Sequence, residues 1–453
     1  MQSGFAMLCA GSVRQKNVKN IMLKNLLDAC GGALGFWTVG YAVAYDNGSS
    51  TGKDFFGTEN FFIKDFSSGG DYIGWFFQFA FAATAATIVA GTVAERCKMS
   101  AYLCYSIFLT AIIYPVVVRS IWSGSGFLTA FRADPFRDVG VVDFAGSGVV
   151  HMTGGATALV AAIILGPRKG RFYDEDGNPL ETPTDFPAHS VALQILGTFI
   201  LWFGWYGFNP GSALAIDNPD SAATAALCAV TTTIAAAAGC VTSMFTDTLI
   251  EYSKTGEASY DLTMAMNGAL GGLVGITAGC SVVQPWAALC IGIVAGWVYV
   301  GFSKFLVAMK IDDAVDAVPV HFANGAWGVI AVGLFAEESA MATAGYNTGH
   351  LGWFYGFDDA NLLLVQICSI LWICGWVFAT MTPFFYVLNV LGMFRVDALE
   401  EEVGLDISHH RGAAYDLSAP KKEDVEELME VRASRHGKVE VPKEVAQAAE
   451  ETA

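Results

Sequence analysis

The stretch Asp143-Phe-Ala-Gly-Ser-Gly-Val-Val-His151-Met-Thr-Gly-Gly-Ala156 leads into an apolar run that ends at Gly166. Its length and apolarity fit a helix that crosses a lipid bilayer. One acid stands at its start and one histidine in its interior. An ionisable side chain inside such a span costs roughly 3 kcal/mol or more, so His151 is by default a candidate functional residue.

The same pattern of acid, histidine and small residues recurs 170 residues later in the chain. The second copy, Asp313-Ala-Val-Asp-Ala-Val-Pro-Val-His321-Phe-Ala-Asn-Gly-Ala326, repeats Asp-x7-His-x3-Gly-Ala. A single histidine of this kind is as easily explained as a hydrogen-bonded core side chain as by a function. Two matched spans indicate two homologous halves with a site where they meet, so the pair favours a shared functional site.

Small residues flank both histidines at helical spacing. Gly154 follows His151, and Gly325 and Gly328 follow His321. Small side chains let two helices approach closely within a membrane. We therefore expect the two imidazoles to lie edge to edge in a narrow passage.

The composition is that of a membrane protein with several spans. Of the 453 residues, 54% are apolar and only 15% are charged, and 49 are glycine. A soluble multidomain enzyme would need far more charge. The ten cysteines show no zinc-like paired spacing, and the sequence contains no P-loop, GxGxxG or HExxH motif. We predict no enzyme active site, no cofactor, no metal site and no nucleic-acid partner.

Ten stretches are long and apolar enough to be full membrane spans. They lie at roughly 23–45, 72–94, 99–122, 144–166, 188–210, 221–249, 262–280, 284–309, 317–336 and 361–393. The apolar stretch 1–13 reaches only about 20 Å as a helix, and we interpret it as the last half of a first span whose beginning is missing. If the repeat holds, spans one to five and six to ten form the halves, and the eleventh is extra.

The distribution of charge predicts the orientation and the division of the chain. Alternate loops carry twelve Lys and Arg residues before the tail, whereas the opposite loops carry five. By the positive-inside rule, the first connection and the tail are cytoplasmic. We expect a transmembrane domain over 1–393, with its first helix truncated, and a cytoplasmic tail over 394–453 that is partly disordered.

Aromatic residues gather near the outer ends of several spans, including Phe81, Trp122 and Phe208. For any single ring, a belt at the membrane interface is the plainer interpretation. The alternative is an outer vestibule that holds a small cation, because aromatic faces attract ammonium-type ions. The hydroxyl of Ser212 is then an acceptor for an N–H bond. Asp143 lies two turns before the histidine, so we expect it to cap its helix or to favour a cation nearby.

Together these segments resemble the Amt/Mep/Rh family of ammonium transporters, in its plant- and alga-like branch, from Met1 to about Tyr415. The segments that carry the resemblance are MQSGFAMLCAGSVRQKN, KNLLDACGGALGFWTVGYAVAY, AGTVAER at 90–96, DFAGSGVVHMTGG, WFGWYGFNPGS and DDAVDAVPVH. The resemblance implies an all-α fold of eleven helices, in two inverted five-helix repeats plus a final helix. It also implies a homotrimer with one pore in each protomer, set in the lipid of the plasma membrane.

The family's functional positions can be assigned to residues of this chain by their motifs. The resemblance implies a twin-histidine pore, a stacked phenylalanine gate and an outer ammonium site with a nearby acid. By this resemblance, His151 and His321 are the twin histidines, and Phe81 and Phe208 form the gate. Trp122 and Ser212 line the outer site, and Asp143 is the nearby acid.

The tail segment from Gly404 to Tyr415 resembles the family's regulatory tail. In that tail a threonine is often phosphorylated, and Ser408 occupies its position in this chain. The resemblance therefore implies a kinase as a partner. Arg411 stands where glycine is usual, which puts the local backbone turn in question.

We expect transport of ammonium or ammonia. A bare ammonium ion loses its hydration in hydrocarbon, so the favourable route selects the cation outside, removes its proton and passes ammonia through the histidine pore. Two alternatives remain open. One is an ammonium sensor with little flux, in which the tail carries the signal. The other is a membrane cytochrome that uses His151 and His321 as axial haem ligands.

Overall fold

The computed structural model describes residues 1–45 and 55–415, and the regular elements of this part are all helices. Nine helical segments of the described chain are long and apolar enough to cross a membrane. They are Gln15–Ala44, Gly69–Thr92, Met99–Trp122, Ser147–Leu165, Val191–Ala213, Pro219–Thr255, Pro285–Ala308, Val318–Phe335 and Asn361–Val390. The predicted disorder at the end of the tail falls outside the described residues.

Two further helices complete the eleven that the sequence predicts. Helix α1 covers Gln2–Ser12, within the apolar stretch 1–13. The predicted span 262–280 is the shorter apolar helix α10, Leu262–Thr277. The centres of the other predicted spans lie within a few residues of the centres of the observed helices. The span predicted at 23–45 begins earlier, at Gln15.

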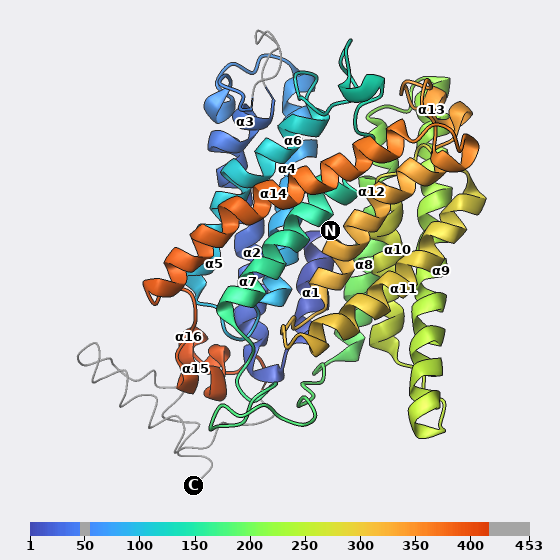
Figure 1. Ribbon diagram of the computed structural model, residues 1–453. Coiled ribbons are helices and arrows are strands. Elements are labelled where there is room, and N and C mark those ends of the chain that lie inside the picture. Colours follow the sequence, from blue (N-terminus) through green and yellow to red (C-terminus); the bar gives the residue numbers. More distant parts are fainter. Residues whose placement is uncertain (46–54, 416–453) are drawn as a thin grey trace.

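Several spans consist of more than one regular element. The second span contains α2 (Val18–Gly35) and α3 (Tyr41–Ala44), and the fourth contains α5 (Met99–Phe108) and α6 (Tyr114–Trp122). The remaining long helices are α4 (Gly69–Thr92), α7 (Thr153–Leu165), α8 (Val191–Phe208), α9 (Pro219–Thr255), α11 (Pro285–Ala308), α12 (Asn324–Phe335) and α14 (Asn361–Val390). Helix α14 runs obliquely across α7 and α12 (Figure 1).

Local signals in the sequence account for where several helices begin. Ser68 and Asp71 form a capping box at the start of α4. Asn218 caps α9, with proline at the next position, and Asp261 caps α10. These side chains satisfy backbone N–H groups that have no partner within the helix. Gly256 ends α9 with a φ of 76°, a conformation that glycine adopts without steric strain.

The interior of the bundle is packed through small residues. A Cβ atom on Gly239 of α9 would lie 2.4 Å from the carbonyl oxygen of Gly268 on α10. One on Gly292 of α11 would lie 2.3 Å from the carbonyl oxygen of Ala235. The small residues of α9 are therefore used for packing within the chain.

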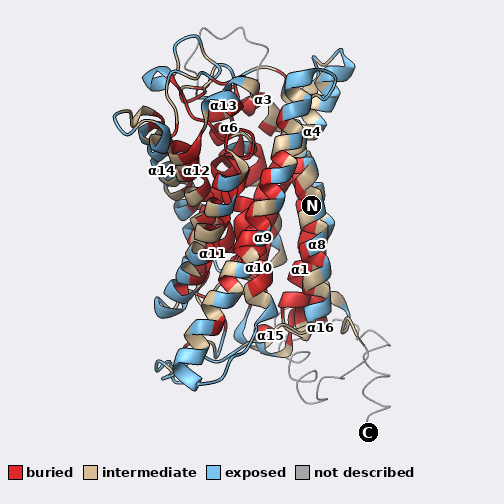
Figure 2. Cartoon of the chain, turned by 90° about the vertical axis from the view of Figure 1, so that its right-hand side faces the viewer, coloured by how far each residue is buried: buried red, intermediate tan, exposed pale blue. Residues whose placement is uncertain are grey.

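The outside of the bundle is apolar where a membrane would surround it. Buried residues form its interior, and exposed ones cover its outside and both ends (Figure 2). Many of the exposed side chains along the helices are large and apolar, among them Phe199 and Phe203 on α8 and Leu371 on α14. Such a surface requires a lipid environment, since water would make it prone to association.

Candidate functional site

The two predicted histidines meet at the centre of the bundle. The Nδ1 atoms of His151 and His321 lie 3.2 Å apart, and their ring planes are inclined by only 16°. At a centroid distance of 5.2 Å the rings are edge to edge, as predicted. Both side chains are buried. One Nδ1 must carry a hydrogen and the other a lone pair, so the hydrogen bond assigns different tautomers to the two rings.

Each histidine stands on a π-helical segment, one in each half of the chain. His151 lies in η6 (Ser147–Met152), and His321 lies in η8 (Val318–Ala323). Such widened turns are rare and are often found at functional sites. Glycines bring the two segments together, because a Cβ atom on Gly155 would lie 2.4 Å from the backbone nitrogen of Phe322.

The two acids of the repeat cap these segments. The carboxylate of Asp143 accepts hydrogen bonds from the backbone N–H groups of Gly146, Gly148 and Val149, at 2.8–2.9 Å. In the second half, Asp313 accepts a bond of 2.6 Å from the N–H group of Val318. Both acids thus accept hydrogen bonds from backbone N–H groups that have no partner within the helix at the start of a π-helical segment. Asp143 does so behind the vestibule, where its side chain is only 2% exposed in total.

Aromatic rings enclose the histidine pair. Trp205 stacks on His151 with a centroid distance of 5.2 Å, and its indole nitrogen donates to Thr277 at 2.9 Å. Phe208 lies 5.4 Å from the same imidazole, and Phe5 of α1 lies 6.0 Å from the other. Sequence reasoning assigned no role to Trp205 or Phe5. The position of Trp205 three residues before Phe208 on one helix was a usable signal, but nothing local pointed to Phe5.

The predicted gate and the predicted outer site are adjacent. Phe81 and Phe208 lie against each other with ring centroids 4.2 Å apart. Trp122 meets Phe81 edge-on at 5.6 Å. Above these rings is a cavity of about 360 Å³, lined by Phe77, Gln78, Phe81, Trp122, Ser212 and Tyr346 among others. Its lining comes from the end of α6 and the region of α13 (Glu338–Thr343), which lie at the end of the bundle opposite to the tail helices (Figure 1).

The polar groups of this vestibule are held by the backbone. The hydroxyl of Ser212 donates to the carbonyl oxygen of Phe208 at 2.7 Å, so its own lone pairs remain able to accept an N–H bond. The indole nitrogen of Trp122 donates to the carbonyl oxygen of Asp143 at 2.7 Å, which fixes the ring. The structure therefore brings Phe81, Trp122 and Ser212 to one cavity and places Asp143 behind them.

A second, small cavity lies beyond the histidines. It has a volume of about 20 Å³, and its lining includes Phe5, Cys9, Thr87, Asn267 and His321. The hydrogen-bond distance between the imidazoles leaves no space for a metal ion and a porphyrin between their nitrogens. The alternative of a haem held between His151 and His321 is therefore wrong.

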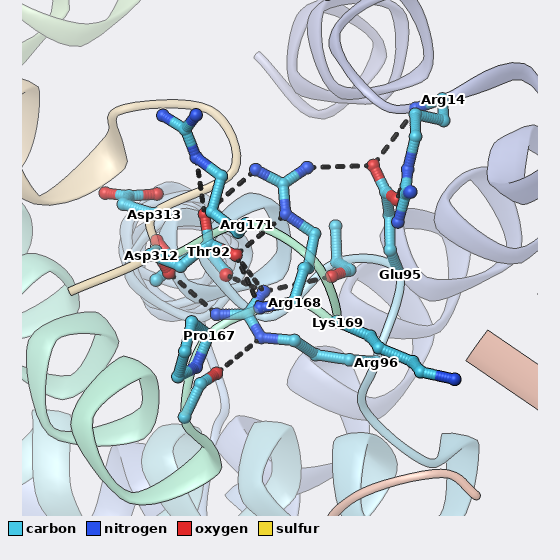
Figure 3. A network of polar contacts seen from close by, with 12 residues as sticks. Arg14, Thr92, Glu95, Arg96, Pro167, Arg168, Lys169, Arg171, Asp312 and Asp313 are labelled. Atoms are coloured by element: carbon cyan, nitrogen blue, oxygen red, sulfur yellow. Dashed lines mark hydrogen bonds and ion pairs between the residues drawn. The ribbon is translucent and has the colours of Figure 1, made fainter. Parts of the chain in front are cut away.

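Charged loops are tied together at the tail end of the bundle (Figure 3). Glu95 forms ion pairs with Arg14 and with Arg168, and the second has an N–O distance of 3.0 Å. Arg168 also binds both carboxylate oxygens of Asp312, at 2.8 and 2.9 Å. The guanidinium of Arg96 donates to the carbonyl oxygen of Asp312 at 2.7 Å. This network joins four connections that are far apart in the sequence.

The buried charges of this network stabilise one another. Burial opposes ionisation of Asp312, but Arg96 and Arg168 hold the pKa of this carboxyl below its usual range. Burial likewise opposes the charge on Glu95, yet Arg168 and Arg14 lower its pKa. The paired acids in turn raise the pKa of Arg168 against the effect of its own burial.

The tail packs on this end through α15 (Ala398–Val403) and α16 (Leu405–His410). Asp406 accepts hydrogen bonds from the backbone N–H groups of Lys19 and Asn20, at 3.0 and 2.9 Å. It thereby caps the start of α2. Ser408 is wholly buried, and its hydroxyl has no hydrogen-bond partner among the described residues. Arg411 adopts the left-handed conformation, with a φ of 60°, that glycine would adopt freely.

Comparison with known families and proteins gives a consistent result. The model of a family described as the Ammonium Transporter Family matches residues 1–415. "Ammonium transporter 1 member 3" of Solanum lycopersicum is 42% identical over 436 residues, covering 92% of this chain and 90% of its own. "Ammonium transporter Amt2" of Archaeoglobus fulgidus is 42% identical over 418 residues, covering 92% and 85%.

Solved structures share the fold. A protein described as "Sensor Amt Protein" is 31% identical, with a TM-score of 0.76 over 90% of this chain and 94% of its own. Mep2 of Candida albicans is 25% identical, with the same TM-score over 93% and 91%.

Proposed function

The chain belongs to the ammonium transporter family; it is a multi-pass membrane transporter of ammonium and not an enzyme, and from this premise we propose how its residues act. The vestibule binds the cation, the ion loses its proton at the phenylalanine gate, and ammonia passes the histidine pair. The observation that carries this proposal is the contact of His151 and His321 directly beneath the aromatic vestibule.

The vestibule suits ammonium because it combines ring faces with the free lone pairs of the Ser212 hydroxyl. Trp122 and Phe81 present aromatic surface to the cavity, and such faces attract a cation by roughly 1–2 kcal/mol. Ser212 accepts one N–H bond of the ion. Asp143 adds negative charge from behind the tryptophan without contacting the cation, since its carboxylate is occupied by backbone N–H groups.

Below the vestibule, the ring pair of Phe81 and Phe208 separates the hydrated side from the pore. A charged ion cannot replace its water shell among these rings, whereas neutral ammonia has much less hydration to lose. The histidines then offer ammonia hydrogen bonds in an otherwise apolar passage. An imidazole exchanges protons near neutral pH, so the pair also suits the transfer of the released proton.

We further propose that residues 1–393 form the transporter domain and 394–453 a regulatory tail on the cytoplasmic side of the plasma membrane. The basic loops that predict this orientation include Arg14, Arg96 and Arg168, which gather in one network at the tail end. Protomers assemble as a homotrimer through apolar outer faces, because the small-residue face of α9 is occupied within the protomer. Native mass measurement in mild detergent tests this, and a monomer with full transport would contradict it.

The tail is proposed to regulate transport through Ser408. A phosphate there adds nearly two negative charges beside Asp406. Because this hydroxyl is buried in the docked tail, a kinase can reach it only after the tail has moved away. Phosphorylation then prevents the tail from docking again, which separates it from the first residues of α2.

An ammonium sensor with little flux is the second candidate, and the similarity to "Sensor Amt Protein" is the observation in its favour. We favour transport because the relatives named as transporters are more similar, at 42% or above. Ammonium-dependent current together with uptake of isotope-labelled ammonium, in cells that lack their own transporters, tests the proposal. Specific binding without uptake would favour the sensor instead.

A further inference from the structure

Helix α2 carries an acid inside the membrane that the pore mechanism above does not use. Asp28 lies within the span Gln15–Ala44, and its side chain is 0% exposed. An ionisable residue at such a position is rare and usually functional. The phenolic hydroxyl of Tyr102 on α5 donates a hydrogen bond to its Oδ2 atom. The other oxygen, Oδ1, accepts no hydrogen bond from the described residues.

This acid is separated from the pore by one layer of side chains. Thr87 of α4 and Cys9 of α1 both line the small cavity that contains His321. The hydroxyl of Thr87 also faces the carboxyl group of Asp28, and the Cys9 thiol lies within its electrostatic reach. At about 20 Å³ the cavity has room for roughly one water molecule.

The surroundings of Asp28 supply one compensating charge. Lys24 lies one turn earlier on α2, wholly buried, and its ammonium group donates to the carbonyl oxygen of Cys97 at 2.8 Å. It is also 5.3 Å from the ring centre of Tyr102. From α5, Tyr105 and the Ser106 hydroxyl face the acid as well. Because the ammonium of Lys24 is directed to a carbonyl, a simple structural ion pair does not explain the acid.

We propose that Asp28 is the proton acceptor on the inner side of the histidine pair, which rests on the proposed deprotonation of ammonium at the gate. A protonated His321 gives its proton to a water molecule in the small cavity and becomes neutral again. The oxygen of Thr87 takes a proton from this water while its own hydroxyl proton moves to Oδ1 of Asp28. The carboxylate becomes a carboxylic acid, and the cavity water is restored.

The hydroxyl of Thr87 is arranged for this exchange. It accepts from the amide nitrogen of Gln2 at 2.8 Å and donates to the carbonyl oxygen of Ala83 at 2.9 Å. In the proposed step its hydrogen turns from that carbonyl to the carboxylate of Asp28, which the hydroxyl faces. Lys24 lies one turn nearer to the start of α2, where its ammonium group donates to the carbonyl oxygen of Cys97 in the loop after α4.

The test compares the wild type with Asp28→Asn and Asp28→Glu in reconstituted vesicles. Charge moved and labelled nitrogen taken up are measured on the same preparation. We expect the charge moved per nitrogen to fall roughly a hundredfold in Asp28→Asn, a typical loss when a positioned proton acceptor is removed, and to be largely retained in Asp28→Glu. Thr87→Val should resemble the former, whereas Thr87→Ser should resemble the wild type.

An infrared difference spectrum provides a readout that does not depend on flux. Addition of ammonium should produce the carbonyl band of a protonated carboxyl group in the wild type, shift it in Asp28→Glu and remove it in Asp28→Asn. A wild type that takes up nitrogen without moving charge would overturn the role of Asp28 while leaving ammonium transport intact. An unchanged ratio of charge to nitrogen in Asp28→Asn would overturn it as well. Absence of all uptake in the wild type would instead count against the proposed function.

Discussion

His151 and His321 form a single hydrogen-bonded unit, because their Nδ1 atoms are 3.2 Å apart and only one of them carries the shared hydrogen. The Nε2 atom of His151 has no hydrogen-bond partner among the described residues. It is therefore a polar position that a passing ammonia molecule can use. The hydrogen bond needs both rings, and each half of the chain contributes one of them.

We predict that His151→Ala and His321→Ala each lower ammonium uptake roughly tenfold or more. Each substitution removes a hydrogen bond for ammonia in a dry passage, and a bond of about 1.4 kcal/mol corresponds to a tenfold change. Uptake of labelled ammonium at equal surface abundance measures the effect. His189→Ala is the matched control, since that ring lies outside the pore against the carbonyl of Val13. Wild-type flux in both pore variants would remove the assignment.

Trp122→Leu should weaken the affinity for ammonium, whereas Phe208→Ala should change the maximal rate. The first removes the ring face that attracts the cation, a loss of roughly 1–2 kcal/mol, or about fivefold to thirtyfold in affinity. The second opens the ring pair with Phe81 beneath the vestibule. The concentration dependence of uptake, with ammonium and methylammonium, separates the two effects. If both variants match the wild type with both ions, the rings are only an interfacial belt.

Asp312→Asn is expected to destabilise the protein by about 3–5 kcal/mol, because it removes one of the two carboxylates that pair with the buried charge of Arg168. Thermal unfolding in detergent measures this loss. Asp134→Asn is the control, since Asp134 pairs with Arg132 but its own side chain is 76% exposed. That change should shift stability by about 0.5 kcal/mol at most. Equal melting temperatures for the two variants would contradict a stabilising network.

Ser408→Asp should reduce transport, whereas Ser408→Ala should retain it. The side chain is wholly buried in the docked tail, so a charge there forces α16 away from α2. Alanine fits the same space and leaves no polar group unsatisfied. Transport at equal surface abundance is the measurement, with Ser253→Asp on the exposed end of α9 as the control. Equal transport in both Ser408 variants would make the tail a passive anchor.

Acidification should release the tail through His410. Its Nε2 atom lies 2.8 Å from the side-chain amide nitrogen of Asn20, which requires a neutral ring that accepts. Burial lowers the pKa of His410 from the usual 6.5, and positive charge nearby adds to the shift. The charged neighbours are His409 on α16 and Lys19 and Lys24 on α2.

The sign of this effect follows from linkage. The docked ring binds a proton less readily than the free ring, so docking is favoured above pH 6.5 and weakens as the pH falls below it. Hydrogen exchange of residues 405–410 across this range measures docking. His410→Gln keeps an acceptor but cannot titrate, so its exchange should not change with pH. A pH response of the same size in this variant would assign the switch to another group.

Much of the fold could be predicted because membrane spans depend on local properties. Apolar runs of sufficient length and their charged borders marked ten spans, and a spacing of eight residues marked the acid and histidine of each half. The span boundaries deviate most at the second span, which begins at Gln15 instead of 23, and at α9, which ends at Thr255 instead of 249. The meeting of His151 with His321 was predictable because a repeated motif indicates symmetry, and symmetry brings equivalent residues together.

Only the tertiary structure decided which other side chains join this pair and which surfaces remain free. Phe5 reaches an imidazole, and Asp28 approaches the pore, through helix contacts that leave no pattern within their own segments. Trp205 was signalled only by its spacing from Phe208 on the same helix. The small-residue face of α9 suited a neighbouring protomer as well as α10 by composition alone, and packing assigned it to α10. Composition and periodicity describe what one helix can bury; which partner it meets depends on the shapes of all the others.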